Sequence, residues 1–273
     1  MEHSALNEAK RLLDAGDLKA AIEAVTREVK ARPADTAART FLFELLVFAG
    51  EWERALRQLD VVAGQNTQSE LGAQVYRNNI RAMRERERLW SESLAPHFLS
   101  EPPADVDQHL AAIKELNAGR PLEAQKLLDT AAAERTPLAG RTDEGEFDDW
   151  RDADDLLAPV LELIISDKYT WLPFAQIKRV EFAPPRQLRD LVWCPVRIET
   201  RQGTIGEMFV PALYEGSNRH TDDLVKLGRL TDWQSVGEAG EGAATLARAV
   251  GLRLFMAGDE EKSIFEVRRV EFN

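Results

Sequence analysis

The sequence has only one cysteine, Cys194, among 273 residues. An intrachain disulfide is therefore excluded, and the apolar neighbours of Cys194 in residues 191–196 favour a buried structural thiol. No apolar run approaches the roughly 18 residues that a membrane helix needs. The start of the chain, residues 1–13, is charged and amphipathic and lacks the apolar core of a signal peptide. We expect a cytoplasmic protein without a membrane partner.

Catalytic motifs are also missing from the sequence. It contains no phosphate-binding P-loop pattern, no nucleophile elbow and no thiol cluster. The histidines show no metal-ligand spacing; they are His3, His97, His109 and His220. We therefore predict no catalytic, cofactor-binding or metal-binding residues and do not expect an enzyme.

Two stretches nevertheless have a composition that ligands use. Residues 237–242 are glycine-rich and precede an expected helix, as in a phosphate cradle, but their two glutamates would repel a phosphate. Asp152, Asp154 and Asp155 offer oxygen ligands but lack the glycine and terminal glutamate of a calcium loop. We interpret the first as an ordinary loop and the second as a solvated acidic loop that caps the next segment. A metal- or nucleotide-binding C-terminal domain remains the alternative.

The net charge of -12 and the isoelectric point of about 5.0 disfavour nucleic acid as a partner. Half of this charge lies in residues 141–155, where eight acidic residues face two arginines. Residues 135–149 also contain few large apolar side chains. We expect them to form an acidic surface linker.

The N-terminal half contains a repeat with a period of 34 residues. Gly16 and Gly50 each end one apolar helical stretch and begin another, with alanine five positions later and an apolar residue nine positions later. Glycine relieves the left-handed conformation at the end of a helix, and alanine lets the second helix approach the first. The pattern returns at Gly119. Such units resemble degenerate tetratricopeptide repeats.

A long helix is expected at residues 69–95, between the second and third repeats. Its polar face is rich in arginine: Arg77, Arg81, Arg84, Arg86 and Arg88. We predict that residues 4–134 form about seven helices in a superhelical stack, whose concave groove holds a peptide or helix. The residues that line the groove are not indicated by the sequence. A role of the helices as a scaffold for the second domain stays open.

From residue 150 the composition changes to short strand-like runs. Residues 192–200 alternate apolar and polar side chains, as in a half-buried strand, and Gly203 suggests a hairpin. We predict an antiparallel sheet or barrel, one helix near residues 245–250, and a last strand near 265–272. Other expected strands cover residues 160–165, 169–173, 178–182 and 205–210.

Charged and aromatic residues lie close together at two places in this half. Asp190 stands near Trp193, and Arg229 and Asp232 precede Trp233. They suggest either a binding face or, as we favour, buried aromatic rings with charged rims.

The second half resembles a known family. The motifs are 150–155 (WRDADD), Pro159, Glu162, 169–174 (YTWLPF), 189–195 (RDLVWCP), 211–217 (PALYEGS) and 227–233 (LGRLTDW). Together with the degenerate repeats, they are similar to the ImpE/TagJ family of type VI secretion accessory proteins. The resemblance implies an adaptor that binds a helix of the contractile sheath's small subunit and touches the AAA+ unfoldase that recycles the sheath. It brings no catalytic residues.

These observations predict an α+β protein. A tetratricopeptide-like helical domain is expected at 1–134, the acidic linker at 135–149, and a smaller, mainly antiparallel β domain at 150–273.

Overall fold

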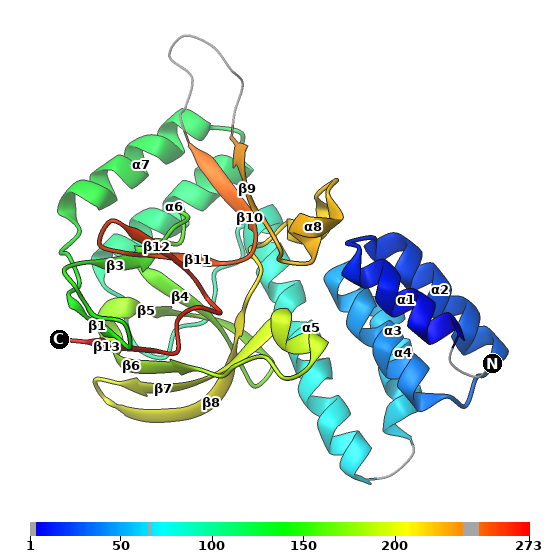
Figure 1. Cartoon of the computed structure of the whole chain (residues 1–273). Helices are drawn as coiled ribbons and strands as arrows, with labels where there is room; N and C mark the ends of the chain where they lie inside the picture. The colour runs from blue at the N-terminus through cyan, green and yellow to red at the C-terminus, as the bar shows by residue number, and fades with distance from the viewer. Residues whose placement is uncertain (1–3, 65–66, 237–245) are drawn as a thin grey trace.

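A computed structural model describes residues 4–64, 67–236 and 246–273. Helices fill the first half of the chain and short strands fill the second (Figure 1), so the predicted α+β class is confirmed. No helix of the described residues is long and apolar enough to cross a membrane. The long helices are α1 (Ser4–Asp14), α2 (Leu18–Ala31), α3 (Thr36–Phe48), α4 (Trp52–Ala63), α5 (Thr67–Glu92), α6 (Ala104–Asn117) and α7 (Pro121–Glu134).

The helical hairpins form as the repeat predicts. Gly16, Gly50 and Gly119 have φ values of 85°, 67° and 71°, in the left-handed region where glycine carries no Cβ penalty. The side chains of Asp17 and Asp35 accept hydrogen bonds from backbone N–H groups at the starts of α2 and α3. Small buried residues such as Ala21, Ala55 and Ala124 lie where paired helices come close.

The seven helices do not form the continuous stack that we expected. Helices α1 to α5 pack in sequence, but α6 and α7 lie beside the sheet, separated from α1–α4 by α5 (Figure 1). Helix α5 packs against α4, α6 and strand β5, so its surface is divided between the neighbouring helices and the sheet. Arg86 was assigned to the polar face of this helix, but it is 1% exposed and faces the sheet.

Within the described residues, the strands form one large and two small sheets, and every strand pair in them is antiparallel. The strands expected in residues 160–210 are confirmed, and the last strand is shorter than expected. The eight-stranded sheet has the order β2 (Glu146–Phe147), β1 (Gly140–Thr142), β13 (Arg269–Phe272), β6 (Ile177–Phe182), β7 (Trp193–Thr200), β8 (Gly203–Pro211), β4 (Val160–Ile165), β5 (Lys168–Pro173). The small sheets are β12 (Glu260–Ser263), β11 (Leu254–Ala257), β3 (Trp150–Asp152) and β10 (Ala247–Gly251), β9 (Thr231–Ser235).

Two sequence expectations are wrong in this half. The expected helix near 245–250 is strand β10 where the structure describes it, because pairing with β9 overrides the helix preference of its alanines. The expected linker at 135–149 contains β1 and β2, which extend the large sheet at its edge. Strand pairing uses backbone groups, so acidic side chains can point outward while Phe147 enters the aromatic cluster around Trp150.

The helices and the sheet share one apolar core. Phe43 of α3 and Tyr76 of α5 both pack against Trp193 of β7, with ring centroids 6.4 Å and 5.8 Å away. Part of the helical domain in which we expected a groove is thus covered by the chain's own C-terminal half.

Candidate partner-binding groove

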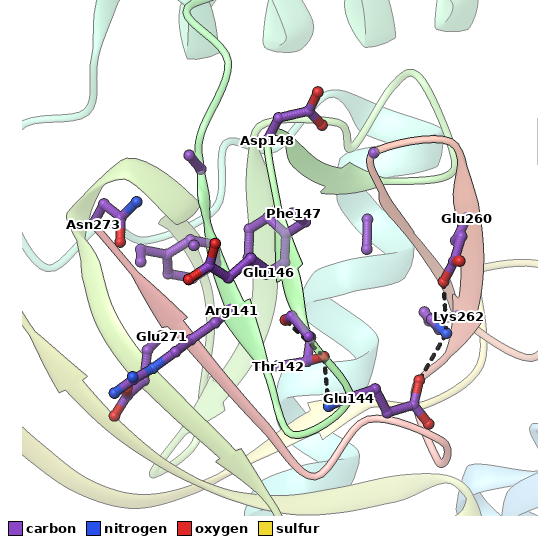
Figure 2. A pocket seen from close by; sticks show the side chains of 16 residues that line it. Arg141, Thr142, Glu144, Glu146, Phe147, Asp148, Glu260, Lys262, Glu271 and Asn273 are labelled. Atoms are coloured by element: carbon purple, nitrogen blue, oxygen red, sulfur yellow. Dashed lines mark hydrogen bonds and ion pairs between the residues drawn. The ribbon is translucent and has the colours of Figure 1, made fainter.

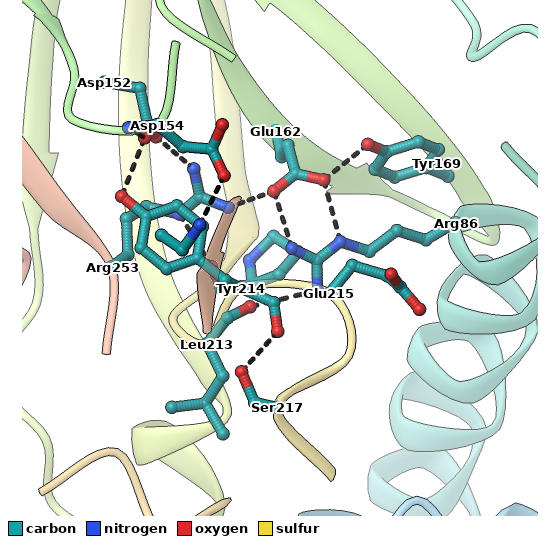
Figure 3. Close-up of polar contacts among 12 residues, drawn as sticks. Arg86, Asp152, Asp154, Glu162, Tyr169, Leu213, Tyr214, Glu215, Ser217 and Arg253 are labelled. Carbon is teal, nitrogen blue, oxygen red and sulfur yellow. Dashed lines mark hydrogen bonds and ion pairs between the residues drawn. The ribbon is translucent and has the colours of Figure 1, made fainter. Parts of the chain in front are cut away.

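A fully buried charge network joins α5 to the sheet (Figure 3). Glu162, in the middle of β4, accepts hydrogen bonds from Arg86 Nε at 2.7 Å and Nη2 at 2.6 Å, and it also pairs with Arg253. Arg253 pairs in turn with Asp152. Burial alone would raise the pKa of Glu162, but the two guanidinium groups outweigh it and lower the pKa to about 2. Glu162 therefore stays ionised.

Asp152 and Asp154 belong to this network, so the expectation of a solvated acidic loop is wrong for both. Their side chains are 0% and 2% exposed. Protein donors replace water at these carboxylates: Asp152 accepts a hydrogen bond from the hydroxyl of Tyr214, and Asp154 accepts hydrogen bonds from the N–H groups of Leu156 and Ala249. Burial and the neighbouring charge of Asp152 raise the pKa of Asp154 to about 7. Only Asp155 is exposed. The two buried carboxylates are occupied by protein donors, which are the side chains of Tyr214 and Arg253 and the backbone N–H groups of Leu156 and Ala249 among others.

The other single candidates that the structure describes lie in separate surroundings. Cys194 is buried, and desolvation raises its pKa to about 12, far from that of a reactive thiolate. His109 is buried, and its Nδ1 atom lies within hydrogen-bond distance of the carbonyl oxygen of Leu156. The Nε2 atom of His220 lies 3.1 Å from Oδ2 of Asp232. His3 and residues 237–242 lie outside the described residues. Among those described, no group of three His, Cys, Asp or Glu side chains has the arrangement of a metal site.

The charged and aromatic pairs of the second half have separate roles. Trp193 is fully buried, and the carboxylate of Asp190 accepts hydrogen bonds from the backbone N–H groups of residues 186 and 187. Arg229 binds the helical part of the chain, whereas Trp233 on β9 is 43% exposed. The favoured interpretation, buried rings with charged rims, therefore holds for Trp193 and not for Trp233.

A surface hollow lies between the β1–β2 hairpin and β12, with a volume of about 990 Å³ (Figure 2). Its charged side chains mainly neutralise each other. Lys262 bridges Glu144 and Glu260 at 2.7 Å and 2.9 Å, and Arg141 pairs with Glu271. We see no arrangement there that selects a ligand.

A second hollow, of about 610 Å³, lies where the first two repeats meet the C-terminal half. We name it the α2–α8 groove. Helix α2 forms one wall, the start of α4 forms the second, and the segment with η3 (Ser217–Arg219) and α8 (Asp223–Lys226) forms the third. Leu18 and Ile22 of α2 contribute its apolar floor, and both are largely buried.

The third wall is attached directly to the turns of the two repeats. Arg229 donates hydrogen bonds to the carbonyl oxygens of Leu13 and Asp14 at the end of α1, at 2.7 Å and 2.8 Å. At the start of α2, Asp223 accepts a hydrogen bond of 3.2 Å from the N–H of Lys19. The turn at Gly16 is thus held on both sides by residues 223–229 of the C-terminal half.

Close packing at Gly50 and Gly16 reinforces this attachment. A Cβ atom on Gly50 would lie 1.8 Å from Asn218 Nδ2, and one on Gly16 would lie 2.6 Å from Leu224 Cδ2. Glycine at these positions therefore serves both the left-handed turn and the approach of the C-terminal segment. These contacts hold the third wall against the repeats, so the groove is preformed.

Ionisable side chains line the rim of the groove. Its five cations are Lys19, Arg27, Lys30, Arg54 and Lys226, and its three acids are Glu23, Glu51 and Asp223. Burial alone would raise the pKa of Asp223, but hydrogen bonds from Lys226 and from the N–H of Lys19 outweigh it and lower the pKa. The groove thus carries a positive charge on a protein whose net charge is -12.

Sequence reasoning missed both the network and the third wall of the groove. A signal for the network was present, since Glu162 and Arg253 are lone charges inside the apolar runs 160–165 and 252–255. The third wall comes from residues 218–226, outside the range 4–134 in which we expected the groove. No local pattern indicates a contact between residues about 200 positions apart.

Comparison with known proteins agrees with this architecture. The ImpE protein family matches residues 144–271, and the tetratricopeptide repeat matches residues 12–77. The chain is 33% identical to the type VI secretion system accessory component TagJ of Pseudomonas aeruginosa, over 97% of this chain and 90% of that protein. A crystal structure of a Vibrio parahaemolyticus protein has the same fold, with a TM-score of 0.86 over 97% of both chains at 24% identity. The chain belongs to the ImpE/TagJ family.

Proposed function

We propose that this protein is a cytoplasmic, non-catalytic accessory component of a type VI secretion system. The observation that carries the proposal is its similarity to TagJ along nearly the whole chain, together with a tetratricopeptide-like half. Helical repeats of this class hold peptides or helices of other proteins. The partner that the family resemblance implies is a short helix of the contractile sheath's small subunit.

The second part of the proposal concerns what the adaptor does after binding. By holding one sheath subunit, it would bring the sheath to the AAA+ unfoldase that recycles it. A preformed binding surface suits this task, because a rigid site loses little conformational entropy when the partner docks. The buried network from α5 to β4 and the docked third wall provide such rigidity.

Co-purification from cells tests the proposal. The tagged full chain is expressed with the cognate sheath small subunit, either intact or without its N-terminal helix. We expect the intact subunit to be retained and the truncated subunit to be lost. Equal retention of both would overturn the helix contact, and retention of neither would overturn direct binding to the sheath.

A further inference from the structure

We propose that strand β9 joins two copies of this chain into a symmetric dimer by pairing edge to edge with the β9 of the second copy. The inference goes beyond the proposed function, because it concerns the small sheet of β9 and β10 and not the helical repeats. It is carried by the direction of the backbone groups of β9, by the exposure of Trp233 and by the order of side chains along the strand.

The outer side of β9 presents backbone groups to a further strand. In an antiparallel pair, two directly opposite residues either exchange both backbone hydrogen bonds or point these groups away from each other. On β10, the N–H groups of Ala249 and Gly251 donate to buried side chains of the core, so they point away from β9. The opposite residues, Trp233 and Thr231, therefore point their N–H and C=O groups outward, and alternation adds Ser235. Within the described residues β9 pairs with β10 alone, so this edge is open.

The side chains of β9 do not block pairing with another chain. Edge strands are commonly protected by charged residues, and three of the four residues of the edge strand β12 are charged. Strand β9 has one charged residue, Asp232, and an exposed aromatic ring, Trp233, at its centre. A large exposed ring beside free backbone groups favours burial against a partner strand.

A second copy of β9 fits this edge in one antiparallel register. With the two-fold axis at Trp233, the two indole rings lie opposite each other on one face, and Thr231 of each copy lies opposite Ser235 of the other. The three outward-pointing residues of each strand then exchange backbone hydrogen bonds. Asp232 lies opposite Gln234, whose amide can donate to the carboxylate, so no like charges are opposed.

Neighbouring registers fit less well. A shift of the axis to Asp232 would place two carboxylates directly opposite each other, which is destabilising. A shift to Gln234 would move Thr231 beyond the end of the other β9 and lose its backbone hydrogen bonds. A dimer with the axis at Trp233 carries two tetratricopeptide-like halves, so it can hold two sheath subunits, a consequence that rests on the proposed function.

Sedimentation velocity of the full chain tests the inference. The wild-type mass should rise from that of one chain, 30.7 kDa, towards that of two between about 1 µM and about 200 µM, since a short paired edge gives a weak interface. Because residue 233 faces itself across the axis, Trp233→Lys or Trp233→Glu should each weaken self-association about tenfold or more. The control Leu99→Lys replaces a side chain of similar exposure between α5 and α6, and it should stay within about twofold of the wild type.

Two further samples identify the register and the backbone contact. An equimolar mixture of Trp233→Lys and Trp233→Glu should form dimers again, because opposite charges then meet on the axis. Ser235→Pro removes an outward N–H group and leaves the pairing with β10 intact, so it should also weaken the dimer. A wild type that stays monomeric over the whole range, a dimer that the Trp233 and Ser235 variants retain, or a mixture that stays monomeric would overturn the proposal. Sheath binding does not enter these measurements, so the adaptor function is tested separately.

Discussion

Removal of Arg86 should destabilise the whole protein, although this residue belongs to a helix rich in surface arginines. Arg86→Met deletes two charge-assisted hydrogen bonds to Glu162 and one hydrogen bond of 3.0 Å to the carbonyl oxygen of Leu213. Methionine fills much of the same space, so the change mainly removes charge. It leaves Glu162 ionised in a buried place, with Arg253 as its remaining cation.

The size of the effect follows from burial. Loss of one partner from a buried ion pair costs about 3–5 kcal/mol, because the other charge remains without compensation. Arg253 and the hydroxyl of Tyr169 still bind Glu162, which places the expected loss near the lower end, about 3 kcal/mol. Arg84, two positions earlier, pairs with Glu53 at the surface, where such pairs contribute about 0–1 kcal/mol.

Urea unfolding of the wild type, Arg86→Met and Arg84→Met at neutral pH measures these differences. We expect Arg86→Met to lower the free energy of unfolding by about 3 kcal/mol and Arg84→Met to lower it by less than about 1 kcal/mol. Similar small losses in both variants would refute the reasoning, since they would mean that the network does not anchor α5 to the sheet.

Three further predictions concern the turns, the buried acid and the thiol. Gly119→Ala should lower the free energy of unfolding by roughly 1–2 kcal/mol, because alanine must adopt a left-handed conformation there. Gly50→Ala should lower it further, because the new Cβ atom also meets Asn218. Thermal unfolding of both variants compares the two losses. Asp154, with a raised pKa of about 7, favours folding most below its unfolded pKa and loses this contribution as the pH rises through 7. Urea titrations at pH 5 and pH 8 should thus show a larger loss of stability in the wild type than in Asp154→Asn, and equal losses would contradict the shift. Cys194 should not react with a thiol reagent such as DTNB at pH 8 until the protein is unfolded, and rapid labelling of the folded protein would show that it is accessible.

The repeat and the strands could be predicted because their signals are local. A glycine that ends a helix, an alanine five positions later and an alternating strand such as residues 192–200 each express a preference within one or two turns of chain. The same reasoning wrongly predicted a helix at β10, where an alanine-containing segment pairs with β9. It also predicted a linker at β1 and β2, because their acidic side chains give no sign that the backbone is paired in a sheet.

The candidate groove could not be predicted, because it depends on contacts between distant parts of the chain. The sequence of α5 does not indicate that Arg86 pairs with Glu162 of the sheet. The residues around Gly50 do not indicate that Asn218 packs against it. The division into domains at 1–134 and 150–273 stays a prediction. Since both parts contribute to one core around Trp193, we propose that they unfold together in a single transition.

The central claim is that the protein binds a helix of the sheath small subunit directly. Hydrogen–deuterium exchange of the full chain, with and without a saturating concentration of the sheath small-subunit helix peptide, tests it most directly. The account predicts slower exchange in the tetratricopeptide-like half when the peptide is bound. Slower exchange confined to other elements, or no change at a concentration that saturates binding, would contradict it.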